Sequence, residues 1–313
     1  MKVGDFYGHK CKKLKYRTNK EFPTQDAVGI EIEIEKVNDI YQPKVEGFIN
    51  YWNTTGDDSL RNQGREYVTV SELWGEDITI ALDLMKEFLS LNKEGGYVEV
   101  SERCSIHVHV DVRDLLINEL RNFLLVATAV EPLLFKVSGN RRGNIYCIPA
   151  SDFYNGNKHI QMIAESKEDK CNILDTAKYS SMNTSALHKY GSIEFRHHEG
   201  TDDVNRIKNW IKCLLNIKEY ARGIDEVIAD FPFFVSSIGF AEFIQAVFKE
   251  QTEQFLYAGF HLDLIEGVRT VQEGMFLREI ERVNNKLRKK GEGKLIKNFI
   301  ETNEDRFIVE GKK

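Results

Sequence analysis

The sequence contains few cysteines, and none of them is spaced to form a disulfide framework or a zinc site. Its five cysteines lie far apart, and no Cys-x-x-Cys pair is present. Disulfide-rich domains and structural zinc sites both need paired or clustered thiols. We therefore expect five reduced thiols, which is the usual state in the cytoplasm.

Long apolar runs and an excess of positive charge are missing as well. The most apolar run, Phe123–Phe135, is too short to span a bilayer and is interrupted by Glu131 and Pro132, so we interpret it as a buried helix. A formal net charge of −6 argues against a surface for unspecific binding of nucleic acid, and no nucleic-acid motif occurs. We expect neither nucleic acid nor a membrane as a partner.

The N-terminal segment is polar and basic, and it lacks the apolar core of a signal peptide. We interpret residues 1–27 as a basic leader. The remaining chain, residues 28–313, is long enough to bury a core of its own and shows no internal repeat or linker. We expect a single domain there, with a helical C-terminal third from about residue 202.

The segment Gly29–Glu35 alternates isoleucine with glutamate. In a β-strand, this period of two places the three isoleucines on one face and Glu31, Glu33 and Glu35 on the other. Three like charges along one strand face repel one another unless a cation neutralises them. The segment is compatible with a divalent metal site and also with the solvated face of an antiparallel sheet, with Glu35 at its rim.

A second strand, Cys104–Asp111, has the same alternation. Ile106, Val108 and Val110 face one way, and His107, His109 and Asp111 face the other. Two histidines on one strand face are candidates for metal or phosphate binding, although a histidine with ordinary surface contacts fits the pattern equally well.

A hairpin supplies the third informative strand. Lys178–Leu187 and Ser192–His198 flank the turn His188–Gly191. On the second strand, Glu194, Arg196 and His198 share the face opposite to Ile193 and Phe195. A lone Glu194–Arg196 ion pair would contribute little if exposed, so its meaning depends on its neighbours.

The remaining elements are expected from turn residues, caps and helical periodicity. Gly64–Val70 forms a short strand that carries Glu66, Lys44–Trp52 is extended, and Ser151–Asp175 is a mobile polar excursion outside the core. Arg141 and Arg142 lie in a loop. The expected helices are Glu76–Leu91, a helix capped by Asp114 that ends near Lys136, a helix capped by Thr201 and Asp202, Val235–Lys249 and Val271 to about Lys290, whose basic end is solvated.

If these strands lie in one sheet, the helices cover its apolar face and the other face forms a charged wall. This wall consists of Glu31, Glu33, Glu35, Glu66, His107, His109, Glu194 and Arg196. Carboxylates with imidazoles are ligands typical of Mg²⁺ or Mn²⁺. The chain has no Walker loop for phosphate.

The order of these motifs resembles the putative amidoligase family of phages, bacteria and fungi, within the carboxylate-amine ligase superfamily of glutamine synthetase and glutamate-cysteine ligase. The resemblance covers roughly residues 28–205, and Cys104-Ser105 departs from it where a glycine often precedes the two histidines. Its carriers are Gly29-Glu31-Glu33, Asp58-Ser59-Leu60, Gly64-Glu66-Tyr67-Val68, His107-His109, Tyr179 with Asn183, and Glu194-Arg196 with Gly200-Thr201.

The resemblance implies an α+β fold in which a curved antiparallel or mixed sheet forms a funnel, with ATP at one end and the substrates at the other. It also implies roles for individual residues. Arg196, Glu66 and Glu194 are the implied catalytic residues, and His107, His109, Arg141 and Arg142 bind the nucleotide. The implied ligands of Mg²⁺ are Glu31, Glu33, Glu66, His107 and Glu194.

The implied activity is an ATP- and Mg²⁺-dependent ligation of a small amine or amino acid to a carboxylate, through an acyl phosphate, in the cytoplasm of the cell or of a phage's host. The carboxylate would belong to an amino acid, a peptide or a cell-wall fragment. Two alternatives remain open: a metal-dependent hydrolase or phosphotransferase, and a non-catalytic binding or virion protein. The sequence gives neither the substrates nor the oligomeric state.

Overall fold

The computed structural model describes most of the chain. The described residues are 1–9, 22, 26–57, 59–139, 141–152, 156–166, 171, 173, 179–224, 228 and 230–290. The basic end of the last predicted helix lies outside the described side chains.

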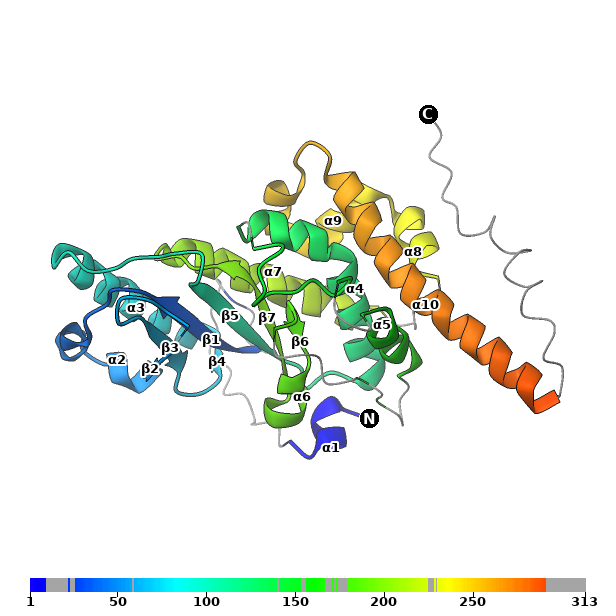
Figure 1. Cartoon of the computed structure of the whole chain (residues 1–313), viewed down its shortest axis with the longest axis horizontal. Helices are drawn as coiled ribbons and strands as arrows, with labels where there is room; N and C mark the ends of the chain where they lie inside the picture. The colour runs from blue at the N-terminus through cyan, green and yellow to red at the C-terminus, as the bar shows by residue number, and fades with distance from the viewer. Residues whose placement is uncertain are drawn as a thin grey trace.

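Within this described part, seven strands form one open antiparallel sheet (Figure 1). Their order is β2-β3-β1-β5-β7-β6, and β4 pairs with the beginning of β1. The strands are β1 (Ala27–Ile34), β2 (Trp52–Gly56), β3 (Arg65–Thr69), β4 (Leu73–Trp74), β5 (Ser105–Asp111), β6 (Met182–Asn183) and β7 (Ser192–Glu199).

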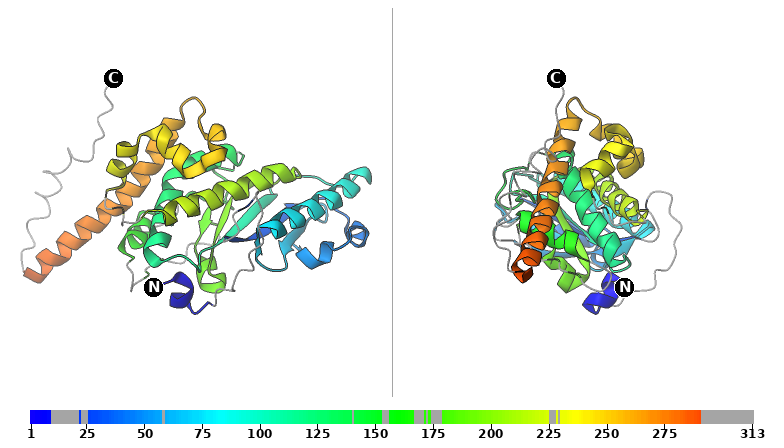
Figure 2. Two further views of the ribbon diagram at one scale, coloured as in Figure 1. Left: turned by 180° about the vertical axis from the view of Figure 1, so that it is seen from behind. Right: turned by 90° about the vertical axis from the view of Figure 1, so that its right-hand side faces the viewer.

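Helices pack on one face of this sheet, with α4 against β7 and α7 against β5 (Figures 1 and 2). The prediction of an α+β fold with helices on the apolar face of an antiparallel sheet is confirmed at this level. The helical elements are α1 (Val3–Tyr7), η1 (Asp39–Lys44), α2 (Phe48–Tyr51), α3 (Glu76–Glu94), α4 (Ile117–Val137), α5 (Gly156–Glu165), α6 (Ser185–Tyr190), α7 (Val204–Arg222), α8 (Phe231–Ile238), α9 (Phe240–Phe248), η2 (Lys249–Phe255) and α10 (Phe260–Lys290).

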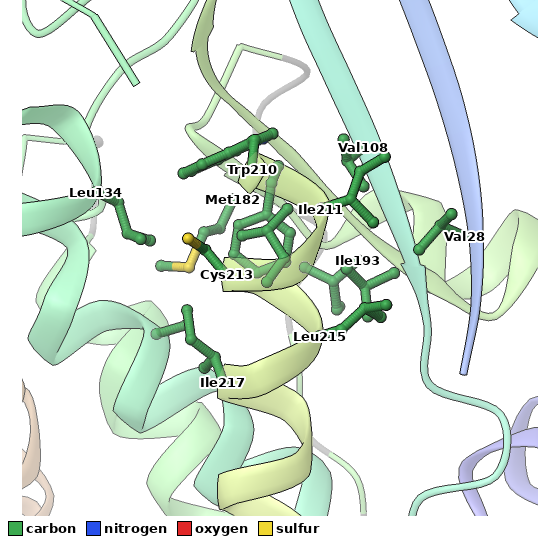
Figure 3. Close-up of a cluster of buried hydrophobic side chains, with 14 of the residues drawn as sticks. Val28, Val108, Leu134, Met182, Ile193, Trp210, Ile211, Cys213, Leu215 and Ile217 are labelled. Carbon is green, nitrogen blue, oxygen red and sulfur yellow. The ribbon is translucent and has the colours of Figure 1, made fainter. Parts of the chain in front are cut away.

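The core lies between the sheet and these helices. Ile30, Ile32 and Ile34 of β1 are fully buried, as the alternation predicted. Figure 3 shows Ile211 and Leu215 of α7 beside the strand residues of the same apolar cluster. Burial of a large aliphatic side chain stabilises a fold by about 2 kcal/mol, so this face holds the sheet rigid beneath the opposite, polar face.

The segment Lys44–Trp52 is not extended as predicted. Asn38 caps the N-terminus of η1, where its side chain accepts a hydrogen bond from Ile40 N. After a short connection, α2 follows. Phe48 of α2 is buried and its ring packs 4.8 Å from that of Phe88. Tertiary burial of this one aromatic residue has overridden the weak local preference for a strand.

The first strand of the predicted hairpin is also shorter than expected. Its pairing with β7 is confirmed, but β6 has only two residues before α6 begins. Asn183 Oδ1 accepts from both N and Oγ of Ser185, and such a local side-chain bond favours a turn into a helix over a continued strand. The predicted turn His188–Gly191 therefore lies at the end of α6.

Ser151–Asp175 is not entirely outside the core. Its described part includes α5, where Ile160 and Ile163 are buried, and α5 packs against α4 and α10. Most residues of the segment are polar, and this overall polarity led to the prediction of a surface excursion. The few apolar residues nevertheless recur at helical spacing and form a narrow buried stripe.

Several helix ends also differ from the prediction. Asp203 caps α7 in place of Thr201 and Asp202, and Asp114 forms ion pairs with Lys218 and Arg222 of α7 while α4 begins at Ile117. The predicted helix Val235–Lys249 is two helices, because Gly239 with φ 97° breaks it. The last helix begins earlier than predicted, at Phe260.

The four cysteines in the described part, Cys104, Cys147, Cys171 and Cys213, are free, in agreement with the expectation of reduced thiols. No single helix in that part is both long and apolar enough to cross a membrane. One bent pair, Phe231–Ile238 with Phe240–Phe255, meets these two criteria together.

Candidate functional site

Strand register brings the predicted carboxylates together on the polar face of the sheet. Glu33 of β1 lies opposite Glu66 of β3, and Glu31 of β1 lies opposite His107 of β5. Side chains at directly opposed positions of neighbouring strands have Cβ atoms about 5 Å apart. The alternation that buries the isoleucines therefore also builds the centre of the site.

The strand β7 closes this cluster on its other side. Glu194 lies opposite His109, and Arg196 Nη1 donates a hydrogen bond to Glu194 Oε1. Arg196 Nε also donates to the carbonyl oxygen of Tyr146 at 3.3 Å. Both contacts fix the guanidinium at the edge of the acidic cluster.

A cavity of about 300 Å³ lies over these residues. Six lining residues were not assigned to the site from the sequence: Asp57, Asn183, Ser185, Ala186, Lys189 and Tyr190. Asp57 looked like an ordinary turn residue, and Lys189 and Tyr190 lay in the predicted hairpin turn. The predicted residues in the lining are Glu31, Glu33, Glu66, His107, His109, Glu194 and Arg196.

Three overlapping groups of side chains have the geometry to hold a cation. In each group the possible ligand atoms lie within 4.8 Å of one another. The groups are Glu31 with Glu66 and His107, Glu31 with His109 and Glu194, and Glu33 with Asp57 and Glu66. Since oxygen atoms dominate each group, the donor set suits a hard divalent cation such as Mg²⁺.

Glu31 is the centre of two of these groups, and two histidines hold it in the charged form. Its carboxylate oxygens lie 3.0 Å from His107 Nδ1 and 3.2 Å from His109 Nε2. Burial alone would raise the pKa of Glu31, but these two contacts outweigh it and the pKa is well below its usual range. The same contact with Glu31 outweighs burial at His109, whose pKa is raised.

Glu66 has the opposite electrostatic environment. Burial raises its pKa, the charge of Glu31 raises it further, and a hydrogen bond from Thr55 Oγ1 at 3.0 Å only partly offsets them. Glu33 contributes to the same repulsion. The cluster thus contains more negative charge than its own residues neutralise, which is the electrostatic condition that a bound cation relieves.

Two neutral side chains orient the charged ones. Ser105 Oγ donates a hydrogen bond to Glu33 Oε2 at 2.5 Å and lies 2.7 Å from His107 Nε2. Asn183 Nδ2 donates to Glu194 Oε2 at 2.7 Å. The serine in the place where the family often has a glycine therefore links two candidate ligands.

Glu35 does not lie at a solvated rim, and that expectation is wrong. Its side chain is only 2 % exposed, and its Oε1 accepts a hydrogen bond from the backbone N of Arg61 at 2.8 Å. A buried carboxylate needs such a donor. Glu35 therefore anchors the turn before β3 and is outside the lining of the cavity.

His198 is also outside the cavity, because β7 contains a bulge. Ile106 pairs with His198 while Val108 pairs with Phe195, so β7 has one extra residue there. A bulge shifts the alternation by one position, which turns His198 towards Trp210 of α7 at a ring distance of 5.6 Å. Burial in this apolar layer lowers the pKa of His198 to about 4.

The two loop arginines are not part of the cavity lining. Arg142 forms an ion pair with Glu266 of α10. Arg141 is 4 % exposed and its Nη1 donates to the carbonyl oxygen of His198 at 3.3 Å, while burial lowers the pKa of Arg141. Their predicted contact with a nucleotide stays a prediction.

A second, wider cavity of about 520 Å³ adjoins the first. The two cavities share Glu31, His109, Lys189 and Tyr190. The wider one extends over Gly29 and Val68, in the direction away from the acidic cluster. Its polar rim includes Asp111, which forms an ion pair with Arg113.

A comparison with models of protein families finds a match to part of the chain. Residues 66–218 match the model of a family described as putative amidoligase enzymes. This region, just under half of the chain, is similar to that family. The match confirms the resemblance seen in the sequence, and it runs from Glu66 on β3 into α7, so it includes His107, Glu194 and Arg196. No curated protein matches the chain.

The amidoligase match points to a ligase that joins a carboxylate to an amine. Glu31 and Glu33 precede the matched region, yet β1 lies between β3 and β5 and brings both carboxylates into the same cluster. The site is therefore assembled from the matched region together with the strand before it.

Proposed function

We propose that the protein is an ATP- and Mg²⁺-dependent carboxylate-amine ligase. The observation that carries this proposal is the register-matched acidic cluster on β1, β3, β5 and β7, in and beside the region that is similar to the amidoligase family. A rigid sheet suits this task because it holds ligands and reactants in fixed positions. The funnel-like arrangement of the glutamine synthetase superfamily is part of the same proposal.

The residues present fit Mg²⁺. Glu33, Asp57 and Glu66 offer one set of oxygen ligands, and Glu31 with Glu66 and His107 or with His109 and Glu194 offers two more. The raised pKa of Glu66 supports this fit, because neighbouring carboxylates repel until a cation lies between them. Bound Mg²⁺ would hold the ATP phosphates and draw off the negative charge that develops during phosphoryl transfer.

The reaction would proceed in two steps. A carboxylate oxygen of the first substrate attacks the γ-phosphorus of ATP, the bond to the β-phosphate oxygen breaks, and ADP leaves. The amine nitrogen then attacks the acyl carbon, the bond to phosphate breaks with its electron pair, and the amine loses a proton. The first step turns a poor electrophile into a reactive one.

Individual residues have distinct roles in this scheme. Arg196, held by Glu194 and the carbonyl of Tyr146, supplies positive charge to the transferred phosphoryl group. Glu66 would accept the proton of the amine through a carboxylate oxygen that does not bind Mg²⁺. Glu194 positions the guanidinium, and His107 and His109 keep Glu31 ionised beside the phosphates.

The two adjoining cavities suit a ligand with an anionic end and an organic body. The smaller cavity contains the acidic cluster and therefore the proposed Mg²⁺, which would attract phosphate or carboxylate groups. The wider cavity, of about 520 Å³, has Gly29 and Val68 in its lining beside charged groups such as Asp111 and Arg113, and it has room for the organic body of a substrate. We propose an amino acid, a peptide or a cell-wall fragment as the carboxylate, and a small amine or amino acid as its partner.

The test is a release assay for ADP with pairs of carboxylates and amines. We expect ADP formation that requires Mg²⁺ and both partners and that is lost in Glu33→Gln while the variant remains folded. A metal-dependent hydrolase or phosphotransferase fits the same ligand groups. Release of phosphate or ADP without an amine would favour that alternative over the ligase.

A further inference from the structure

The C-terminal end of α6 forms the boundary between the two cavities. Lys189 and Tyr190 line both of them. The ring of Tyr190 stands at 90° to the ring of His109, with 5.8 Å between their centroids, and Lys189 Nζ lies 4.7 Å from the Tyr190 centroid. The position of α6 therefore decides how the two cavities connect.

Such a short helix needs support from outside. α6 has six residues, too few to be stable by itself, and the last carbonyl groups of any helix lack partners within it. The carbonyl of Leu187 accepts a hydrogen bond from Gly191 N at 3.0 Å. The carbonyl oxygen of His188 accepts a hydrogen bond from a residue outside α6.

His9 supplies that support from the opposite end of the sequence. Its Nε2 lies 2.9 Å from the carbonyl oxygen of His188 and 3.2 Å from that of Leu187. Because carbonyl oxygens only accept hydrogen bonds, Nε2 must carry the proton. An imidazole donating to the last carbonyls of a helix is a C-terminal cap, here provided across 179 residues.

The segment before His9 is itself fixed to the same region (Figure 1). Val3 N and Gly4 N donate to the carbonyls of Leu115 and Arg113 at 2.8 and 3.0 Å. The ring of Tyr7 packs against the ring of His188 at 4.7 Å. The residues Met1–His9 thus connect the chain after β5 with the end of α6.

A close approach of two backbone segments strengthens this connection. A Cβ atom at Gly4 would lie 3.0 Å from the carbonyl oxygen of Arg113, and one at Gly191 would lie 2.3 Å from Arg113 Cγ. Arg113 therefore packs between the N-terminal segment and the glycine that ends α6. Side chains at these two glycines would separate the parts.

We propose that the N-terminal segment Met1–His9 is a positioning element of the site, and that His9 holds α6 so that Lys189 and Tyr190 form the shared rim of the two cavities. The capping role stands on the geometry alone. The consequence for ligand binding rests on the proposed function.

Hydrogen exchange of the full chain tests the capping role. In His9→Ala, we expect the backbone amides of α6 and Gly191 to exchange about fivefold faster, the loss expected for one hydrogen bond, with unchanged exchange in α4 and α7. His9→Gln keeps a donor and should recover most of the protection. Asp5→Ala, an exposed position on α1, is the matched control. Unchanged exchange in His9→Ala, or equal acceleration in Asp5→Ala, would overturn the proposal.

Calorimetric titration with Mg²⁺ and a non-hydrolysable ATP analogue tests the consequence for the site. We expect about fivefold weaker binding in His9→Ala and near-normal binding in His9→Gln and Asp5→Ala. Equal affinity in all four proteins, together with faster exchange in α6, would overturn the role of the rim. If the wild type itself does not bind the analogue, the proposed function fails, and the exchange data still decide the capping role.

Discussion

Glu33 of β1 and Glu66 of β3 lie directly opposite each other in the sheet, although like charges at opposed positions destabilise a strand pair. The hydrogen bonds they accept come from the hydroxyl groups of Ser105 and Thr55, which carry no charge. Asp57 adds a third carboxylate within 4.8 Å. The sheet thus holds three carboxylates close enough together to bind a cation. Without a cation, their mutual repulsion lowers the free energy of unfolding.

This relationship predicts that Glu66→Gln stabilises the protein when no divalent cation is present. Loss of the repulsion should raise the melting temperature by about 2 °C, the shift expected for up to ~1 kcal/mol in a chain of this size. Added Mg²⁺ should raise the melting temperature of the variant less than that of the wild type, because Glu66 belongs to two of the three candidate ligand groups. Thermal unfolding with EDTA and with Mg²⁺ measures both effects.

Glu102→Gln is the control for this experiment, because Glu102 is an exposed carboxylate whose nearest ion-pair partner is 3.8 Å away. It should respond to Mg²⁺ as the wild type does. A Glu66→Gln variant that is less stable in EDTA, or that gains as much from Mg²⁺ as the wild type, would contradict the cation site.

Ser105→Ala should weaken Mg²⁺ binding without unfolding the protein. The hydroxyl of Ser105 contacts both Glu33 and His107, and groups that orient metal ligands commonly contribute about tenfold to affinity. Titration calorimetry with Mg²⁺ gives the affinity, and circular dichroism checks the fold. Ser90→Ala, at an exposed position of α3, should bind as the wild type does. If Ser105→Ala bound Mg²⁺ as tightly as the wild type, the proposed role of Ser105 in orienting the metal ligands would be wrong.

Arg196→Lys should impair the proposed reaction while Mg²⁺ binding remains. A lysine keeps the positive charge but cannot contact both Glu194 and the carbonyl of Tyr146 in the fixed geometry of a guanidinium. Once a substrate pair is known, we expect ADP formation at saturating substrate to fall about a hundredfold. Full activity in this variant would contradict a role of the Arg196 guanidinium in phosphoryl transfer.

The alternation of apolar and charged residues predicted the centre of the site because it depends on local geometry. In β1, β3 and β5 the pleat alone decides which side chains point away from the helices, so Glu31, Glu33, Glu66 and the two histidines could be assigned to one face. The register then follows from burying every isoleucine on the same side.

The parts that the sequence did not predict depend on contacts between distant segments. One extra residue in β7 moved His198 to the helix-covered face, and no local pattern marks that bulge. Asp57 lies in the turn after β2, and Lys189 and Tyr190 lie at the end of α6, whose last carbonyl groups contact His9 from the opposite end of the sequence. Glu35 continued the alternation in the sequence but is tied to Arg61 N after the strand has ended.

The buried His159 of α5 predicts a specific dependence of stability on pH. Burial lowers its pKa to about 4, below the 6.5 expected when the chain is unfolded. The unfolded chain therefore binds more protons between these two values, so this contribution to stability is complete above pH 6.5 and is lost as the pH falls towards 4. His159→Leu should reduce the slope of unfolding free energy against pH by up to about 1.4 kcal/mol per pH unit.

Denaturant unfolding at several pH values within this window measures the slope, which does not depend on how well leucine packs at the site. His198 should add a similar slope in both proteins, since burial lowers its pKa to about 4 as well. The exposed His261 provides the control, and His261→Leu should keep the slope of the wild type. Equal slopes in His159→Leu and the wild type would contradict a neutral, buried His159.

The most direct test of the account is calorimetric titration of the protein with a non-hydrolysable ATP analogue, in Mg²⁺ and in EDTA, for the wild type and for Glu33→Gln. The account predicts binding to the wild type that requires Mg²⁺ and that is lost in Glu33→Gln, while hydrogen exchange in β1, β3 and β5 stays as slow as in the wild type. Binding that persists in EDTA or in Glu33→Gln, or no binding to the wild type under any condition, would contradict the claim that the acidic face of the sheet holds Mg²⁺ and nucleotide phosphates.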